Sequence, residues 1–206
     1  MFDTNMKKIN DVPYDVQKFI EKIKVKTQED NYRWGEVFEN VFSNTLETTV
    51  KYKEDETTYV LTGDIPAMWL RDSTAQVRPY LVLAKESDEI AKMIKGLVKR
   101  QFQYIQHDPY ANAFNETANG AGHQSDLTDL TDWIWERKYE IDSLAYPLQL
   151  AYLYYRNTGD ASVFDDDFAK GARMIVDLWT LEQRHENSSY RFVRETWRKE
   201  DTLSHD

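Results

Sequence analysis

The residues best suited to chemistry lie in one short run, Thr62–Ser73 (TGDIPAMWLRDS). This run holds two carboxylates, Asp64 and Asp72, together with the guanidinium of Arg71 and the indole of Trp69. An indole can pack on the apolar C–H face of a sugar ring, and carboxylates accept hydrogen bonds from sugar hydroxyls. The combination predicts a sugar-binding turn. A purely structural turn, with an Arg–Asp ion pair and a core Trp, would explain the same residues.

A second candidate region is the polar stretch from Asp108 to Asp132, where hydrophobic periodicity fails. Loops of this length in a compact domain are usually functional or disordered. The aromatic and charged continuation, Trp133–Glu140, favours a functional loop. Within the loop, His123 is the candidate to donate a hydrogen bond to a sugar hydroxyl.

The elements that must position these residues are mostly helices in pairs, with one small β-hairpin. The helix after Asp142 is apolar almost all round, which predicts burial on both sides. The hydrophobic pattern predicts helices over 14–29, from Asn31 to Ser43–Asn44, from Ser73 to about Ala84, from Ser87 past Ile105, from Asp142 to Asn157 and from Phe164 to Trp179, with a hairpin of Thr48–Tyr52 and Thr57–Leu61 and a short strand at Tyr190–Arg194.

The sequence contains one weak internal repeat. Asp72–Ser73 and Asp142–Ser143 each stand at the start of a predicted helix that contains aromatic residues and a proline. If the helix pairs wind into a ring, both helices start at the same mouth and line one pocket. Helix capping by Asp and Ser explains the repeat equally well.

Composition limits the function classes. The 206 residues are 41% hydrophobic and 30% charged, as in an ordinary globular domain, and aromatics reach 14%. A net charge of −10 without a basic stripe argues against nucleic acid. Residues 1–10 lack an apolar signal core and no run is long enough to span a bilayer, so no membrane association and a cytoplasmic location are expected.

Neither a metal nor another cofactor is expected. The chain has no cysteine, and its four histidines lack the close helical spacing of a zinc site. The acidic run Asp165–Asp167 resembles a magnesium-binding cluster, but it falls in the first turn of a predicted helix, where acidic side chains are favoured anyway.

Three segments together resemble glycoside hydrolase family 125, the metal-independent exo-α-1,6-mannosidases. They are Gly63–Ser73 (GDIPAMWLRDS), Ala118–His123 (ANGAGH) and Trp135–Leu144 (WERKYEIDSL). The resemblance runs from about Tyr32 to the end of the chain. It implies a mainly α fold, an (α/α)6 toroid, and hydrolysis of terminal α-1,6-linked mannose with inversion.

Members of that family are about twice as long, so the resemblance implies that residues 1–206 are a single domain forming the N-terminal half of a longer catalytic domain. It also implies that the acid and base lie downstream and that this chain alone is inactive. The expected partners are a mannose-containing oligosaccharide and either the missing C-terminal half or a second copy. Residues expected to bind substrate are Asp64, Trp69, Arg71, Asp72, His123, Trp135 and Tyr146.

If the acid and base lie within this chain instead, the best candidates are Glu136, Glu140 and Asp142, since inversion needs two carboxyl groups roughly 6.5–9.5 Å apart. For Glu140 and Asp142, capping and ion pairing with Arg137 or Lys138 is the competing interpretation. Two other functions stay open: a catalytically inactive sugar-binding fragment, and a helical-pair scaffold for protein partners.

Overall fold

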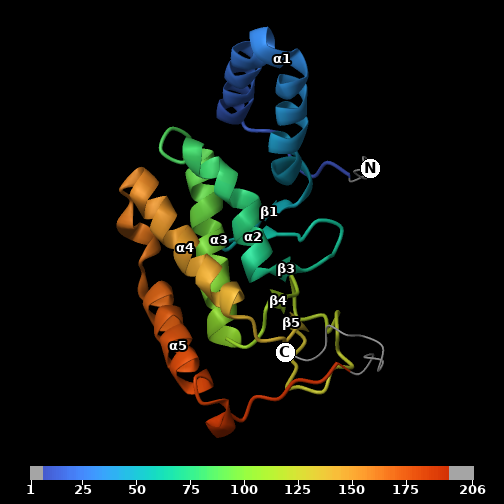
Figure 1. Ribbon diagram of the computed structural model, residues 1–206, viewed down its shortest axis with the longest axis vertical. Coiled ribbons are helices and arrows are strands. Elements are labelled where there is room, and N and C mark those ends of the chain that lie inside the picture. Colours follow the sequence, from blue (N-terminus) through green and yellow to red (C-terminus); the bar gives the residue numbers. More distant parts are fainter. Residues whose placement is uncertain (1–6, 195–206) are drawn as a thin grey trace.

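The computed structural model describes residues 7–194, which form three helical hairpins and two small antiparallel sheets (Figure 1). In chain order the elements are α1 (Tyr14–Thr48), β1 (Val50–Tyr52), β2 (Thr58–Val60), β3 (Met68–Trp69), α2 (Leu70–Val77), η1 (Arg78–Leu83), α3 (Asp88–His107), β4 (Ala113–Phe114), β5 (Ile134–Glu136), α4 (Ile141–Thr158), η2 (Ala161–Val163), α5 (Asp166–Glu182) and η3 (His185–Asn187).

Helix α1 is itself a hairpin of two arms, because the backbone leaves the helical region at Asn31 (φ −165°, ψ 105°). Phe19 of the first arm packs on Phe38 and Phe42 of the second, with ring centroids 6.0 and 5.6 Å apart. The predicted break near residue 30 is confirmed. The paired arms stand at the upper end of the molecule in Figure 1.

The second arm of α1 continues to Thr48, so the predicted end at Ser43–Asn44 is wrong. The hydroxyl of Thr48 donates to the carbonyl of Asn44 at 2.7 Å, and Leu46 is buried. Because these contacts stabilise one more turn, the first hairpin strand begins at Val50 rather than Thr48. The β1–β2 hairpin itself is confirmed, with Val50 opposite Val60.

Helix α2 begins at Leu70, before the predicted start at Ser73. The N–H of Leu70 donates to the carbonyl of Asn112 at 3.1 Å, and Ser73 Oγ donates to the carbonyl of Leu70 instead of capping an N–H group. Strand β3 therefore delivers the chain directly into the helix. The helix tightens into η1 near Pro79, which has no N–H to continue the α-helical pattern.

The helices form two layers. Helix α2 packs chiefly on α4, and α3 packs chiefly on α5. Close approach of α3 and α5 depends on Gly171, where an added Cβ would lie 2.6 Å from Phe102 Cδ1. Successive hairpins with an inner layer (α2, α4) and an outer layer (α3, α5) are the arrangement of a partial α/α toroid, which confirms the predicted fold class.

Three local predictions are wrong. Helix α4 is buried on one side only, since Ile141, Tyr152 and Tyr155 are exposed. The polar stretch from Asp108 to Asp132 contains strand β4, which is too short to show a period. The predicted strand at Tyr190–Arg194 makes a single bridge, between Val193 and Leu127. Among residues 7–194, no helix combines the length and the apolar character needed to cross a bilayer.

Candidate active site

A three-stranded sheet brings the sequence motifs together. Strand β4 pairs with β3 on one side and with β5 on the other, so Trp69 lies opposite Ala113 and Ala113 lies opposite Glu136. Strand β3 leads directly into α2, and β5 is followed within a few residues by α4. The first turns of these two inner helices therefore meet at one mouth, which is the arrangement expected of Asp72–Ser73 and Asp142–Ser143 if the helix pairs wind into a ring.

Arg71 joins the two helix starts. Its Nη1 lies 3.1 Å from Glu140 Oε2 and 3.2 Å from Asp142 Oδ2, while Nη2 lies 3.2 Å from Asp72 Oδ2. Burial alone would lower the pKa of Arg71, but the three carboxylates outweigh it and raise that pKa. One guanidinium thus holds three carboxylates together, with all four side chains still partly open to solvent.

This arrangement corrects the predicted pairing of Glu140 and Asp142 with Arg137 or Lys138. The guanidinium of Arg137 is held elsewhere, by Asp108 at 2.6 Å and by stacking over the ring of Tyr110. Sequence proximity favoured a neighbour two to five positions away, whereas the packing of α2 on α4 supplies Arg71 from a distant segment.

Aromatic side chains line the same side. The rings of Trp69 and Trp135 meet edge to face at 6.4 Å, and the His123 ring lies 6.5 Å from Trp135. The backbone N–H of His123 donates to the backbone carbonyl of Trp135 at 2.8 Å. This approach requires Gly122 (φ +102°), where an added Cβ would lie 2.7 Å from Trp135 Cα. The turn around Trp69 and the loop around His123 therefore form one surface.

Glu136 lies beneath that surface and is buried. Asn112 Nδ2 donates to its Oε2 at 2.7 Å, and Arg194 donates to its Oε1. Burial raises the pKa of Glu136, but the hydrogen bonds from Arg194 and Asn112 outweigh burial and lower that pKa. Glu136 is held as a carboxylate, which suits a hydrogen-bond acceptor or base and does not suit a proton donor.

Arg194 and Asn112 were not found from the sequence. Besides contacting Glu136, Arg194 pairs with the buried Asp126 at 3.2 Å, and its Nη1 lies 3.3 Å from both ring nitrogens of His123. No local pattern marks Arg194, which lies 58 residues from Glu136 in the chain. Asn112 is one of several similar polar residues in its loop.

Two predicted binding residues are less closely tied to this group. Asp64 is exposed in the turn between the bridged residues Thr62 and Ile65. Tyr146 is half-buried on α4, one helical turn beyond Asp142 and so on the same side of the helix. We call the joined residues, Trp69, Arg71, Asp72, His123, Trp135, Glu140 and Asp142, the mouth site.

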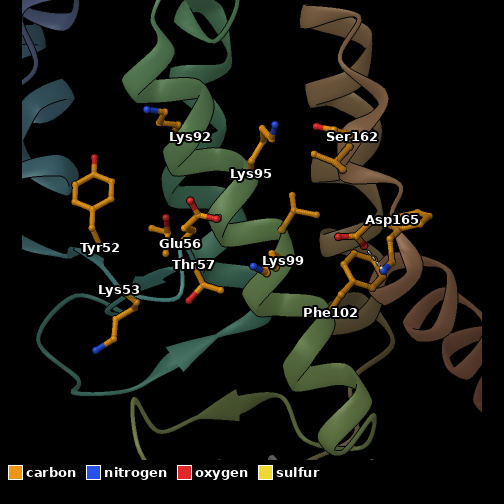
Figure 2. Close-up of a pocket in the computed structure, with 15 residues that line it drawn as sticks. Tyr52, Lys53, Glu56, Thr57, Lys92, Lys95, Lys99, Phe102, Ser162 and Asp165 are labelled. Carbon is orange, nitrogen blue, oxygen red and sulfur yellow. Dashed lines mark hydrogen bonds between the residues drawn. The ribbon is translucent and has the colours of Figure 1, made fainter.

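A separate hollow of about 460 Å³ lies over α3, between the β1–β2 turn and the start of α5 (Figure 2). Four lysines line this outer groove, but they point in different directions and three are engaged by groups of the chain. Lys53 pairs with Glu116 at 2.8 Å, Lys95 pairs with Asp160 at 3.2 Å, and Lys99 donates to a carbonyl. The outer groove offers no converging set of groups for a sugar.

Comparisons with known proteins place the chain in a family. The family described as metal-independent alpha-mannosidase (GH125) matches residues 31–206. A solved Streptococcus pneumoniae structure is 53% identical, with a TM-score of 0.88, and covers 92% of this chain. It is described as a metal-independent alpha mannosidase in a non-productive substrate complex with alpha-1,6-mannobiose.

The fission yeast meiotically up-regulated gene 157 protein is 35% identical over 175 residues, which are 79% of this chain. The chain spans 34% of the yeast protein and 45% of the streptococcal chain, so it corresponds to less than half of either relative. The family match, the shared fold and the three sequence motifs lead to one conclusion: this chain belongs to the GH125 family of metal-independent α-mannosidases.

Proposed function

We propose that this chain forms the sugar-gripping part of an exo-α-1,6-mannosidase that releases terminal mannose from glycans with inversion. The observation that carries the proposal is the mouth site, where Arg71 joins the starts of α2 and α4 beside the Trp69–Trp135 pair. The streptococcal relative, described in complex with alpha-1,6-mannobiose, supports the choice of linkage.

The mouth site has groups for each side of a mannose ring. Trp69 and Trp135 provide apolar faces for the ring C–H groups. Asp72, Glu140 and Asp142 accept hydrogen bonds from hydroxyls, and Arg71 holds these carboxylates close together. His123 and Asp64 add polar contacts at the rim, and Tyr146 extends the wall along α4.

Inverting hydrolysis needs a protonated carboxyl that donates to the glycosidic oxygen as the anomeric bond breaks. It also needs a carboxylate that takes a proton from the attacking water on the opposite face. Arg71 ties Glu140 and Asp142 to Asp72, and both carboxylate oxygens of Glu136 already accept hydrogen bonds, one from Asn112 and one from Arg194. These pairings favour acid and base groups supplied from outside this chain, by the remainder of a longer catalytic domain of which residues 1–206 are the N-terminal half.

A chimera tests this function. The matching segment of the streptococcal enzyme would be replaced by this chain, and products from α-1,6-mannobiose would be followed by proton NMR. We expect hydrolysis with β-mannose as the first product, and no turnover by this chain alone. A cooperatively folded chimera that binds mannobiose but never cleaves it would favour the inactive sugar-binding fragment. Initial release of α-mannose would exclude inversion.

A further inference from the structure

His123 is the mouth-site residue that the long polar loop carries. Its backbone N–H donates to the Trp135 carbonyl, which fixes the backbone at this position but leaves the side-chain torsions to be set by the contacts of the ring itself. The imidazole is 41% exposed. Its contacts are with the ring of Trp135, the carboxylate of Glu136 and the guanidinium of Arg194. These contacts decide how the ring points into the mouth.

Arg194 makes the closest of the polar contacts to this ring. Its Nη1 lies 3.3 Å from both Nδ1 and Nε2 of His123, whereas Glu136 Oε1 lies 3.7 Å from Nε2. A nitrogen at this distance from both ring nitrogens would overlap a ring carbon if it lay in the ring plane, so the guanidinium lies over the face of the ring. Stacking of this kind is favourable for arginine. It leaves the edge of the imidazole, with its N–H and its lone pair, available to a ligand.

The guanidinium of Arg194 is itself held on two further sides, and its side chain is only 16% exposed. Nε lies 3.2 Å from Asp126 Oδ1, and Nη2 donates to Glu136 Oε1. Asp126 belongs to the same loop as His123, whereas Glu136 ends strand β5. One guanidinium therefore fastens the loop to the sheet. The planar fork of arginine can contact three groups at once, which the single ammonium of lysine cannot do with the same geometry.

The backbone that carries Arg194 is also attached to the site. Residues 188–194, which we call the crossing segment, run along the lower edge of the molecule beside the polar loop (Figure 1). Val193 and Leu127 exchange backbone hydrogen bonds at 2.8 and 3.3 Å. The hydroxyl of Tyr190 bonds two backbone groups between β5 and α4, at 2.9 and 3.1 Å. These attachments place Arg194 at a fixed position over His123.

We propose that Arg194 is a positioning residue of the mouth site, which orients the His123 ring so that its edge meets a sugar hydroxyl. The inference rests on the proposed function and deepens it. Arg194 acts through His123 rather than on the sugar, because its guanidinium is largely enclosed and covers the face of the ring. A purely structural ion pair with Asp126 and Glu136 would instead contribute independently of His123.

A double-mutant cycle in the streptococcal chimera separates these two roles. Arg194→Lys keeps a cation beside Glu136 but removes the planar group over His123. We expect Arg194→Lys and His123→Ala each to raise KM for α-1,6-mannobiose about fivefold, the effect of losing one hydrogen bond, and to change kcat less than about twofold. The double variant should also raise KM about fivefold, whereas independent sites would give roughly 25-fold.

Arg191→Met is the matched control in the crossing segment. Arg191 is exposed, and its guanidinium donates to backbone carbonyls of the same segment. Loss of this cation should change KM less than about twofold, as for an exposed charge.

A second measurement uses this chain without sugar. Long-range proton–nitrogen NMR spectra report the ring nitrogens of each histidine. Arg194→Lys should shift the His123 ring signals and leave those of His107 in place, and melting curves establish that the variant is folded. These spectra test the contact between Arg194 and His123 independently of any activity.

Two results overturn the proposal. One is a roughly 25-fold rise in KM for the double variant, because Arg194 would then act independently of His123. The other is a set of His123 ring signals that Arg194→Lys leaves unchanged. A chimera that neither binds nor cleaves mannobiose counts against the proposed function, and the NMR spectra then still decide whether Arg194 orients His123.

Discussion

The mouth site and the outer groove show how differently charge can be arranged in one small molecule. The outer groove encloses about 460 Å³ and is lined by four lysines, but its cations diverge and are tied to separate groups. At the mouth site, one guanidinium gathers three carboxylates from two helices beside two indoles. Convergence of side chains from different elements, rather than enclosed volume, identifies the candidate active site.

The largest expected difference between the two regions follows from Arg71→Met. Removing the shared cation leaves Asp72, Glu140 and Asp142 repelling one another at the mouth. In the streptococcal chimera we expect kcat/KM for α-1,6-mannobiose to fall at least about tenfold, or 1.4 kcal/mol. Lys92→Gln in the outer groove is the matched loss of one cation and should change kcat/KM by less than about twofold. Equal losses would place the outer groove in the reaction.

The charge of Glu136, which lies beneath the mouth site, can be tested by comparing the stability of the protein and of its Glu136→Gln variant at different pH values. Because the folded-state pKa of Glu136 is lowered, its ionised form stabilises the protein above the ordinary carboxyl pKa, and this contribution disappears as pH falls through the folded value. The variant should lose about 1.5–3 kcal/mol at pH 7, as for a hydrogen bond to a charged group. Urea melts between pH 7 and pH 3 should show that the difference in free energy of unfolding between the protein and the variant becomes smaller as the pH falls. A difference that does not change with pH would contradict the ion pair between Glu136 and Arg194.

Packing, not charge, should control the wall of the outer groove. An added Cβ at Gly96 would lie 2.6 Å from Thr58 Oγ1 and 2.9 Å from the Glu56 carbonyl. Gly96→Ala should therefore cost about 1–2 kcal/mol despite the better helix propensity of Ala. Because no charge is involved, urea melts should give the same loss in free energy of unfolding at pH 7 and at pH 5. Lys92→Ala on the exposed side of the same helix is the control, and stabilisation by Gly96→Ala would disprove the close contact.

The smallest expected effect is at Glu56, the only described non-glycine residue with a positive φ (62°). Glu56→Gly should relieve the left-handed strain and gain about 0.5–1 kcal/mol, since the entropy cost of Gly offsets part of the relief. A shift of the urea midpoint, with unchanged kcat/KM in the chimera, would separate backbone strain in the groove wall from function at the mouth. Destabilisation would show that the Glu56 side chain matters more than its φ.

The sequence allowed the fold class and the main site segments to be predicted, because each rests on local information. A run such as Thr62–Ser73 carries its own turn, aromatic and charged residues, and helical periodicity marks α3 and α5 plainly. The errors arose where distant contacts decide the outcome. Asn112 sets the start of α2 by accepting from Leu70, and Arg71, not the nearby Arg137, pairs with Glu140.

Other features had no sequence signal at all. Arg194 reaches Glu136 from a segment outside the named helices and strands, and strand β4 is only two residues long. The free face of α4 was interpreted as buried because an all-apolar helix normally has neighbours all round.

The backbone break at Asn31 coincides with the first residue matched by the family. All residues of the mouth site follow this break in the chain. The first arm of α1, which precedes it, packs on the second arm through the contacts of Phe19 with Phe38 and Phe42. The break at Asn31 thus separates a purely structural arm from the part of the chain that carries the mouth site. Substitutions in the first arm of α1 should change the local stability of the α1 hairpin, measured as the rate of amide hydrogen exchange there. They should leave the mouth site unchanged.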